Sequence, residues 1–252
     1  MPLLPEIPEK LLTEIYNDTT KPGASEAGKA IGGILGILSV ASIPFRLLSG
    51  RANIWLEANL ERYRVKMSQV NTENVIEPPI EIAVPILEKM AITTVEELAE
   101  MFAALLKTSS TSYGIQYAHP NFVNIISSIS RDEAVMISDF NDEFFICTLY
   151  VTLTKANNTY RTPIMGYSNY DTDQRLTFPE NSEIYLENLK NLGLLYKSSA
   201  RISIGNYEDL KTKIQDKLNS TKDPDTTRID ISEQHYGITS LGRLFIKGCV
   251  SI

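Results

Sequence analysis

Few residues of this chain have the types and spacing that catalysis or metal binding would need. The histidines are His119 and His235, and the cysteines are Cys147 and Cys249. A metal site needs several converging His, Cys, Asp or Glu ligands, and the sequence has no HExxH, HxH or CxxC motif that would bring them together. We therefore expect no metal site and no cofactor.

Each histidine has a simpler structural explanation than catalysis. His119 stands directly before Pro120, where its ring can cap the helix that follows or satisfy a loop carbonyl. His235 lies in a polar stretch before an expected strand, which favours a surface position. The acidic pairs at 96–97 and 132–133 are expected at helix starts, where carboxylates interact favourably with the helix dipole.

Two familiar catalytic motifs are also missing from the sequence. The stretch AGKAIGGILG has the glycines of a phosphate loop, but Lys29 precedes them, no GK[ST] follows and no strand leads in. A GxSxG nucleophile elbow does not occur. These observations exclude nucleotide binding at the glycines and favour a protein that is not an enzyme.

The composition is that of an ordinary folded chain of one elongated domain or two small ones. The 252 residues carry a net charge of -7, which divides into 10 - 14 = -4 for residues 1–130 and 14 - 17 = -3 for the rest. This acidic balance disfavours nucleic acid as a partner, although a local basic stripe stays open. Two isolated cysteines and an N-terminus without a secretory signal indicate a cytoplasmic protein.

The most unusual segment is an uncharged apolar run over residues 30–45. Its 16 residues fall short of the roughly 20 that a membrane-spanning helix needs. Residues 24, 28, 32 and 36 are all Ala or Gly, so a second helix could approach closely along them. The residues expected to serve helix packing or membrane contact are Gly28, Gly32, Gly33, Gly36, Ile34, Leu35 and Leu38.

The next segment, residues 51–70, has the spacing of an amphipathic helix. Its apolar stripe consists of Leu56, Leu60, Tyr63, Met67 and Val70. Pro44 and Gly50 supply a turn between the two segments. We expect an antiparallel helical hairpin whose two apolar stripes face each other, within an N-terminal helical bundle.

Further elements follow from start and stop signals along the chain. Thr94 and Glu97 form a capping-box pattern for a helix through residue 108, and Ser130 with Glu133 forms another. The β-branched and aromatic residues of FFICTLYVTLT predict a strand. A helix ending at Gly193 leads into an extended run, DLKTKIQDKL predicts a further helix, and residues 156–182 are expected to be irregular with room for one more strand.

The order of these elements predicts an α+β fold that is mainly α. We expect an N-terminal helical bundle over residues 1–115 and a winged-helix-like module over residues 116–252. Winged helices bind proteins as well as DNA, so this architecture does not settle function.

The same segments resemble the abortive infection alpha family of bacteria and phages. The motifs that carry the resemblance are AGKAIGG with the following PFRLL, Glu77-Pro78-Pro79, ELAEMFAALLKTSS, His119-Pro120-Asn121-Phe122 leading into IISSISRDEA, LENLKNLGLL, and ITSLGRLFIKGC. They cover residues 11–249 except for about 141–182. The resemblance implies a role in phage defence, in which an infected cell stops growing or dies before the phage matures. It assigns no catalytic residues and leaves the role of Glu77, Pro78, His119, Pro120 and Phe122 unknown.

Three functions compete on this basis. The first is an antiphage effector that acts by association, with the apolar segment packed in the core or a homo-oligomer, or released to perturb the membrane. The second is a regulator or sensor whose winged-helix-like half uses Lys190 and Lys197 to bind nucleic acid or a partner protein. The third is a cryptic enzyme such as a nuclease, tested by His119→Ala. A homo-oligomer is the favoured assembly, and a partner protein, a phage component and a membrane stay open as further partners.

Overall fold

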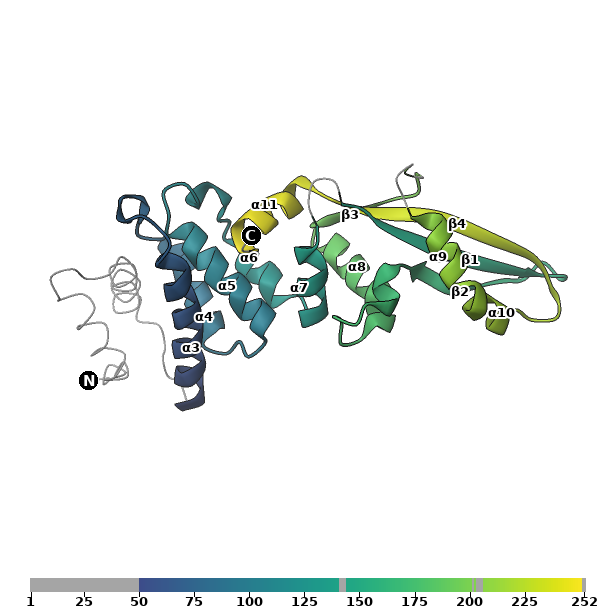
Figure 1. The fold of residues 1–252 in the computed structure, drawn as a ribbon, viewed down its shortest axis with the longest axis horizontal. Helices are drawn as coiled ribbons and strands as arrows, with labels where there is room; N and C mark the ends of the chain where they lie inside the picture. Colours follow the sequence, from purple (N-terminus) through teal and green to yellow (C-terminus); the bar gives the residue numbers. More distant parts are fainter. Residues whose placement is uncertain (1–49, 141–143, 201, 203–205, 251–252) are drawn as a thin grey trace. The chain divides into compact units, whose positions relative to one another are not determined.

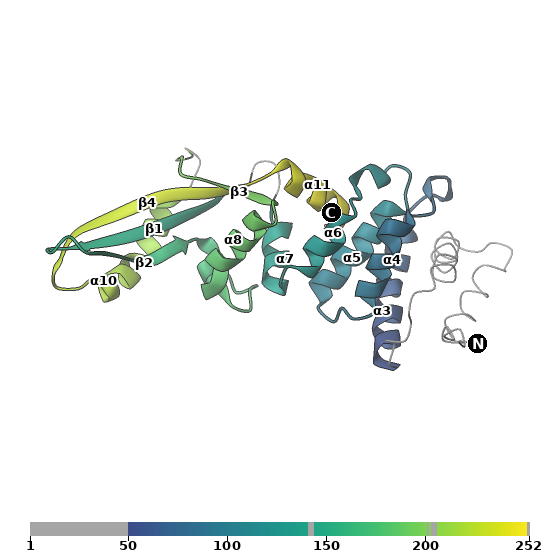
Figure 2. The ribbon, with the colours of Figure 1, turned by 180° about the vertical axis from the view of Figure 1, so that it is seen from behind.

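The structure confirms an α+β protein that is mainly helical (Figures 1 and 2). The computed structural model describes residues 50–140, 144–200, 202 and 206–250, with side chains from residue 54 onward. The apolar run over residues 30–45 lies outside this range. So do the expected packing residues Gly28, Gly32, Gly33, Gly36, Ile34, Leu35 and Leu38. The described residues divide into two compact units, 50–131 with 244–250 and 132–243. The domain boundary expected after residue 115 stays a prediction.

The first unit is built from helices. They are α3 (Gly50–Met67), α4 (Ile80–Met90), α5 (Glu96–Ser109), α6 (Asn121–Ser127) and the end of α11 (Ser240–Cys249). Short 3-10 helices cover Thr72–Asn74 and Ile115–Tyr117. No helix within the described part of the chain has both the length and the apolar character needed to cross a bilayer.

The apolar stripe of α3 is buried as its spacing predicts. All five members, Leu56, Leu60, Tyr63, Met67 and Val70, are at most 5% exposed. The described elements that pack against α3 are α5 and α4. In the middle of the stripe, the Tyr63 hydroxyl donates to Ser110 Oγ at 3.1 Å, and Asn59 Nδ2 donates to the Met90 carbonyl at 2.7 Å.

The expected hairpin partner of this stripe, the preceding apolar run, lies outside the described residues, so that pairing stays a prediction. Among the described elements, α4 and α5 pack against α3, and the stripe is buried. Periodicity shows which side of a helix is apolar, and it carries no information on which of several apolar segments covers that side.

The capping box predicted at Thr94 is wrong. Helix α5 begins at Glu96 with Val95 at the N-cap position, which makes no side-chain capping bond. Glu97 instead pairs with Arg131, whose Nε lies 2.9 Å from Glu97 Oε1. A long-range ion pair has here replaced the local hydrogen bond that the S/T-x-x-E pattern favours.

The second unit contains a four-stranded antiparallel sheet in the order β2-β1-β4-β3. The strands are β1 (Ile146–Lys155), β2 (Tyr160–Tyr167), β3 (Leu195–Ser198) and β4 (Thr226–Ile238). The helices are α7 (Arg131–Ser138), α8 (Ser182–Asn191), α9 (Tyr207–Lys213) and α10 (Gln215–Thr221), with 3-10 turns at Asn169–Thr172 and Pro179–Asn181. The strand predicted over FFICTLYVTLT is thus confirmed as β1, and the single helix expected over DLKTKIQDKL is divided into α9 and α10.

Alternation along β1 gives its two faces different partners. Leu149, Val151 and Leu153 pack in one cluster with residues of α9 and α10, which lie along that face (Figures 1 and 2). Tyr150 points to the other face, where its hydroxyl donates to Glu183 Oε1 of α8 at 3.0 Å. The sheet therefore has helices on both sides, and β1 connects the two layers.

Gly193 ends α8 as the sequence predicts. Its φ of 78° lies in the left-handed region, which costs other L-residues energy. Its N–H donates to the Lys190 carbonyl, and the Leu194 N–H donates to the Leu189 carbonyl, at 2.9 and 3.0 Å. This pair of bonds is a Schellman motif, and it turns the chain directly into β3.

We expect Gly193→Ala to destabilise the protein by about 1–2 kcal/mol, because the left-handed conformation becomes strained. Space is not the cause, since an added Cβ would lie 3.4 Å from the nearest atom, Leu241 Cδ2. Asn191→Ala, an exposed change in the same helix, is the matched control and should be nearly neutral. Urea unfolding of both variants measures the difference, and equal midpoints would contradict the argument.

Candidate functional site

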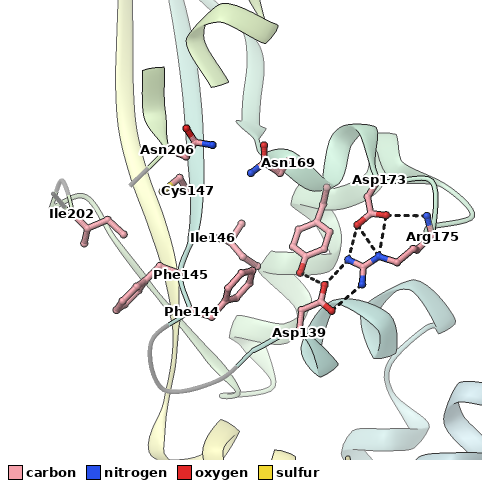
Figure 3. Close-up of a pocket in the computed structure, with 11 residues that line it drawn as sticks. Asp139, Phe144, Phe145, Ile146, Cys147, Asn169, Asp173, Arg175, Ile202 and Asn206 are labelled. Atoms are coloured by element: carbon pink, nitrogen blue, oxygen red, sulfur yellow. Dashed lines mark hydrogen bonds and ion pairs between the residues drawn. The ribbon is translucent and has the colours of Figure 1, made fainter. Parts of the chain in front are cut away.

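A cleft in the second unit is the candidate binding site (Figure 3). Its volume is about 390 Å³. The end of α7, the start of β1, the turn after β2 and the start of α9 supply its walls. Its lining residues are Asp139, Phe144, Phe145, Ile146, Cys147, Asn169, Tyr170, Asp173, Arg175, Ile202 and Asn206.

Arg175 joins two carboxylates on the polar side of the cleft. Its Nη1 and Nη2 donate to the two oxygens of Asp139 at 2.9 and 2.6 Å, a bidentate pair. Its Nε and Nη2 also donate to Asp173, the shorter contact being 2.7 Å. Tyr170 adds a hydrogen bond from its hydroxyl to Asp139 Oδ2 at 2.8 Å. These hydrogen bonds hold the polar side chains of the cleft in place, and the cluster carries one positive and two negative charges.

The cluster also sets the ionisation of its members. The hydrogen bond from Arg175 is the main reason why the pKa of Asp173 lies below its ordinary value. The pKa of Arg175 is raised, first by its hydrogen bond to Asp139 and then by Asp173. Burial, with the nearby Asp139 charge, raises the pKa of Tyr170, so the phenol stays protonated. All of these shifts favour the forms present at neutral pH.

Apolar side chains also line the cleft. Phe144 is 37% exposed and its ring meets Phe140 edge to face, with centroids 5.4 Å apart. Cys147 on β1 also lines the cleft, and burial is the main cause of the raised pKa of its thiol. A thiol with a raised pKa is a poor nucleophile at neutral pH.

The charged groups of the cleft are paired with one another, and the pKa of the Cys147 thiol is raised. A net negative rim of 1 - 2 = -1 beside exposed aromatic carbon fits a ligand that combines an apolar group with hydrogen-bond donors. No group of three or more His, Cys, Asp or Glu in the described part of the chain could hold a metal ion.

His235 is buried, contrary to the expected surface position. Only 4% of it is exposed, and its Nδ1 lies 2.9 Å from the Ala200 carbonyl oxygen. Its Cα pairs with Cys147 on β1 and with Ser198 on β3. The polar neighbours in the sequence misled the prediction, because this end of β4 runs between two other strands and is covered there.

The motif around His119 proves to be a cap joined to a packing anchor. His119 Nδ1 accepts from the Asn121 N–H at 3.1 Å, which confirms the capping prediction. Pro120 occupies the N-cap position of α6. Phe122 is fully buried, 5.6 Å from the His119 ring and 5.3 Å from the Phe245 ring between centroids. These residues position α6 against α11.

Glu77 and Pro78 lie in the extended segment before α4. Glu77 is exposed and Pro78 is buried. Just ahead of them, Ile76 N–H donates to the Ser110 carbonyl at 3.0 Å, and Val75 forms a bridge with Thr111. This short pairing fixes the linker to the end of α5, which gives the motif a structural role.

The cleft residues themselves were missed by sequence reasoning. Tyr170, Asp173 and Arg175 lie in the stretch that the sequence left as irregular, and Asp139 lies in the segment expected to form the helix that starts at Ser130. One signal was available there. Ser168 and Asp171 have capping-box spacing, and each caps the other's backbone around the 3-10 turn that carries Tyr170.

A second polar cluster lies between α8 and the sheet. Glu187 Oε1 accepts from Lys197 Nζ and from the Tyr236 hydroxyl, both at 2.6 Å, and Oε2 accepts from Lys190 Nζ at 2.7 Å. Burial alone would raise the pKa of Glu187, but these three hydrogen bonds outweigh it and hold the pKa at about 2. Lys197 also lies 4.6 Å from the centroid of the Tyr150 ring.

Fold and cleft together define an α+β protein whose polar side chains in the cleft are largely paired with one another. The chain belongs to the abortive infection alpha family, whose model matches residues 56–249. The resemblance seen in the sequence is thereby confirmed. No curated protein matches the chain. The solved structure of an uncharacterized protein from the hydrocarbon-degrading marine bacterium Alcanivorax borkumensis SK2 is 16% identical, covers 52% of this chain and 92% of its own, and has a TM-score of 0.31.

We expect Arg175→Met to lower stability at neutral pH by about 1 kcal/mol, or about 2–4 °C in Tm, because two carboxylates lose their shared cation at a half-exposed site. The folded pKa of Asp173 is depressed, so its contribution is present above the unfolded pKa of about 4 and is lost as pH falls through the folded value. The difference from wild type should therefore shrink below about pH 4.

Thermal melts between pH 3 and pH 8 measure this effect. Arg228→Met is the matched control, because Arg228 is 72% exposed and pairs only at the surface with Asp230. It should change little at any pH. A deficit in Arg175→Met that stays constant with pH would show that lost packing, and not charge, is responsible.

Proposed function

We propose that this protein serves in antiphage defence by abortive infection and acts by protein association or membrane perturbation rather than by catalysis. Membership in the abortive infection alpha family supports this setting, because the family's name refers to abortive infection. In this proposal the protein works in the cytoplasm and reaches a membrane only on activation. Its partners are further copies of itself, a partner protein or a phage component.

The outward face of α3 is the observation that carries the association proposal. Ile54 is 62% exposed, Val65 is 54% exposed and Trp55 is 41% exposed, all on one helix. Single exposed apolar residues are common on protein surfaces, but a group of large ones on one element is typical of interaction sites.

The cleft supports binding over catalysis for a separate reason. Arg175 is held by Asp139 and Asp173, and the Cys147 thiol has a raised pKa. A catalytic acid, base or nucleophile needs a pKa close to the working pH. The raised pKa of Arg175 and Cys147 and the lowered pKa of Asp173 all lie further from neutral pH than the ordinary values.

The finer architecture is part of the same proposal. The packing of α3, α4, α5 and α6 supports a helical bundle. The order α7, α8, β3 and β4, with β3 antiparallel to the end of β4, supports a winged-helix-like arrangement into which β1 and β2 have been inserted.

The winged-helix order also favours one alternative, a regulator or sensor that binds nucleic acid or a partner protein. Its nucleic-acid form is weakened by the placement of the two lysines that the sequence offered for phosphate contacts. Lys190 and Lys197 both bind Glu187, so a phosphate would have to compete with an existing ion pair.

Expression with and without phage tests the main proposal. Wild type should reduce plaque formation, and Gly32→Leu/Gly36→Leu should lose that protection. Leucine fills the row of small residues at 24, 28, 32 and 36, which costs about 1–3 kcal/mol of stability or assembly if a neighbouring helix packs there. Ser68→Leu adds similar bulk at an exposed position and is the control. Sedimentation and liposome flotation of the purified proteins separate self-association from membrane binding.

Two outcomes would contradict this proposal. Unchanged plaque counts across a broad set of phages would remove the defence role. Full protection and an unaltered melting curve in the double leucine variant would show that nothing packs against the row of small residues.

For the alternative, we expect band-shift titrations to show no duplex binding even at low salt, because the chain is acidic and both lysines are paired. Glu187→Gln is the informative variant, because it removes the negative charge that pairs with Lys190 and Lys197. A shift in wild type that weakens steeply as salt rises would establish phosphate contacts and favour the regulator.

A further inference from the structure

Strand β4 has one edge that no described strand covers along most of its length. It pairs with β1 from Thr226 to Tyr236, whereas β3 pairs with its other side only from His235 to Ile238 (Figures 1 and 2). At the opposite end, a bulge at Thr227 interrupts the regular ladder with β1. Between these limits, residues 228–232 form what we call the open edge. Such an edge presents main-chain groups that another strand can bind.

The hydrogen-bond pattern shows which residues direct their main-chain groups to the open edge. In an antiparallel ladder, every second residue points both its N–H and its C=O at the same neighbouring strand. The Thr239 N–H, just past the end of β4, donates to the Leu194 carbonyl on the β3 side at 3.0 Å. Counting back from Thr239 in steps of two assigns Ile231 and Ile229 to this same side. Their N–H and C=O groups therefore point outward, beyond the end of β3.

The side chains of the open edge are apolar on one face of the sheet and charged on the other. Ile229 and Ile231 are 37% and 39% exposed, and they share the face of β1 that α9 and α10 cover. Arg228 and Asp230 lie on the other face, where Arg228 Nη2 is 2.7 Å from Asp230 Oδ1. The open edge is thus electrically neutral within a chain of net charge -7, and two acidic copies can meet here without adding repulsion at the contact.

We propose that the open edge binds the open edge of a second copy of this chain. The two strands run antiparallel about a two-fold axis at Asp230, so that the sheets of the two copies become continuous. Ile229 of each copy then lies opposite Ile231 of the other. The main-chain groups that both isoleucines direct outward all find partners in this register. On the apolar face, the same register joins the two isoleucines of one copy to those of the other.

Length and charge fit the same register. Pairing about Asp230 brings Thr226, the first residue of β4, to about the level of Gln234 of the second copy. Because β3 pairs only from His235 onward, neither copy has to displace it. Arg228 lies diagonally across from Asp230 of the second copy, within reach of a long side chain. These matches favour a second copy over an unrelated extended peptide.

The edge dimer supplies one surface for the proposed association with further copies, and its role in defence rests on that proposed function. The dimer itself can be measured in purified protein without phage. A missing dimer refutes the edge pairing. A dimer whose disruption leaves plaque counts unchanged refutes its part in defence, so the two failures are distinguishable.

Disulfide formation by the full-length purified protein is the test. The two-fold axis places the Asp230→Cys thiols of two copies opposite each other, in a pair whose Cα atoms lie about 4.5 Å apart. Under mild oxidation, this variant should form an interchain disulfide at least about tenfold faster than Arg228→Cys, because Cα atoms more than about 7 Å apart cannot be bridged.

Arg228→Cys is the matched control, since it lies on the same face and breaks the same ion pair. In the proposed register its two copies are offset by four residues, or about 13 Å along the strands. Wild type controls for Cys147 and Cys249 and should form no interchain disulfide.

A proline variant tests the main-chain contacts. Ile231→Pro removes an outward N–H and leaves the ladder with β1 intact, a position at which an edge strand tolerates proline. Added to Asp230→Cys, it should reduce the disulfide yield at least about fivefold, because an edge donor is lost. Ser232→Pro is the control for the fold. The Ser232 N–H faces β1, so this change should lower the melting temperature more than Ile231→Pro does.

Three results would overturn the edge dimer. Equal rates for Asp230→Cys and Arg228→Cys would indicate random collision of exposed thiols. An undiminished yield after Ile231→Pro would assign association to another surface, such as the outward face of α3. Sedimentation of wild type as a monomer up to its solubility limit would show that the two edges do not pair.

Discussion

The two-sided apolar character of α3 is the constraint on which the first unit depends. An amphipathic surface helix has one apolar stripe to bury. Here one stripe, centred on Tyr63, is buried, with α4 and α5 packed against the helix, and the opposite stripe from Ile54 to Val65 is exposed. The first stripe fixes the helix in its unit. The second is exposed and borders α5, whose Glu100 binds Arg62 and Lys66.

In the second unit, a cluster of hydrogen-bonded polar side chains around Glu187 joins helix α8 to the sheet. Strand β4 pairs with β1 from Thr226 to Tyr236 and with β3 from His235 to Ile238. Glu187 of α8 reaches this junction and accepts from Lys197 of β3 and Tyr236 of β4. One carboxylate therefore joins a helix to two strands. The free-energy cost of partly burying this charge is offset by hydrogen bonds from Lys190, Lys197 and Tyr236. The Gly193 turn makes this possible, because it brings β3 back beside α8 within a few residues.

Local signals in the sequence predicted those features that local physics controls. The buried stripe of α3, the strand β1, the cap at His119 and the glycine exit at Gly193 all follow from periodicity, β-propensity or capping rules. The Thr94 cap is not formed, since α5 begins at Glu96, and Glu97 binds the distant residue Arg131. His235 was misplaced because its burial depends on strands that arrive from elsewhere in the chain. The cleft could not be predicted for the same reason: Asp139 and Arg175 are 36 residues apart, and only folding brings them together.

The pairing of exposed cations with the chain's own carboxylates limits how much free energy an acidic partner could gain by binding. In three separate places, cations that could attract an acidic partner are bound by carboxylates of the chain itself: Arg175 in the cleft, Lys190 and Lys197 on Glu187, and Arg62 and Lys66 on Glu100. An acidic ligand at any of them would exchange one ion pair for another, so its net gain is small. Exposed apolar carbon involves no such exchange, and its burial gains roughly 25 cal/mol per Å². In a chain with a net charge of -7, recognition through apolar surface is therefore favoured over recognition through charge.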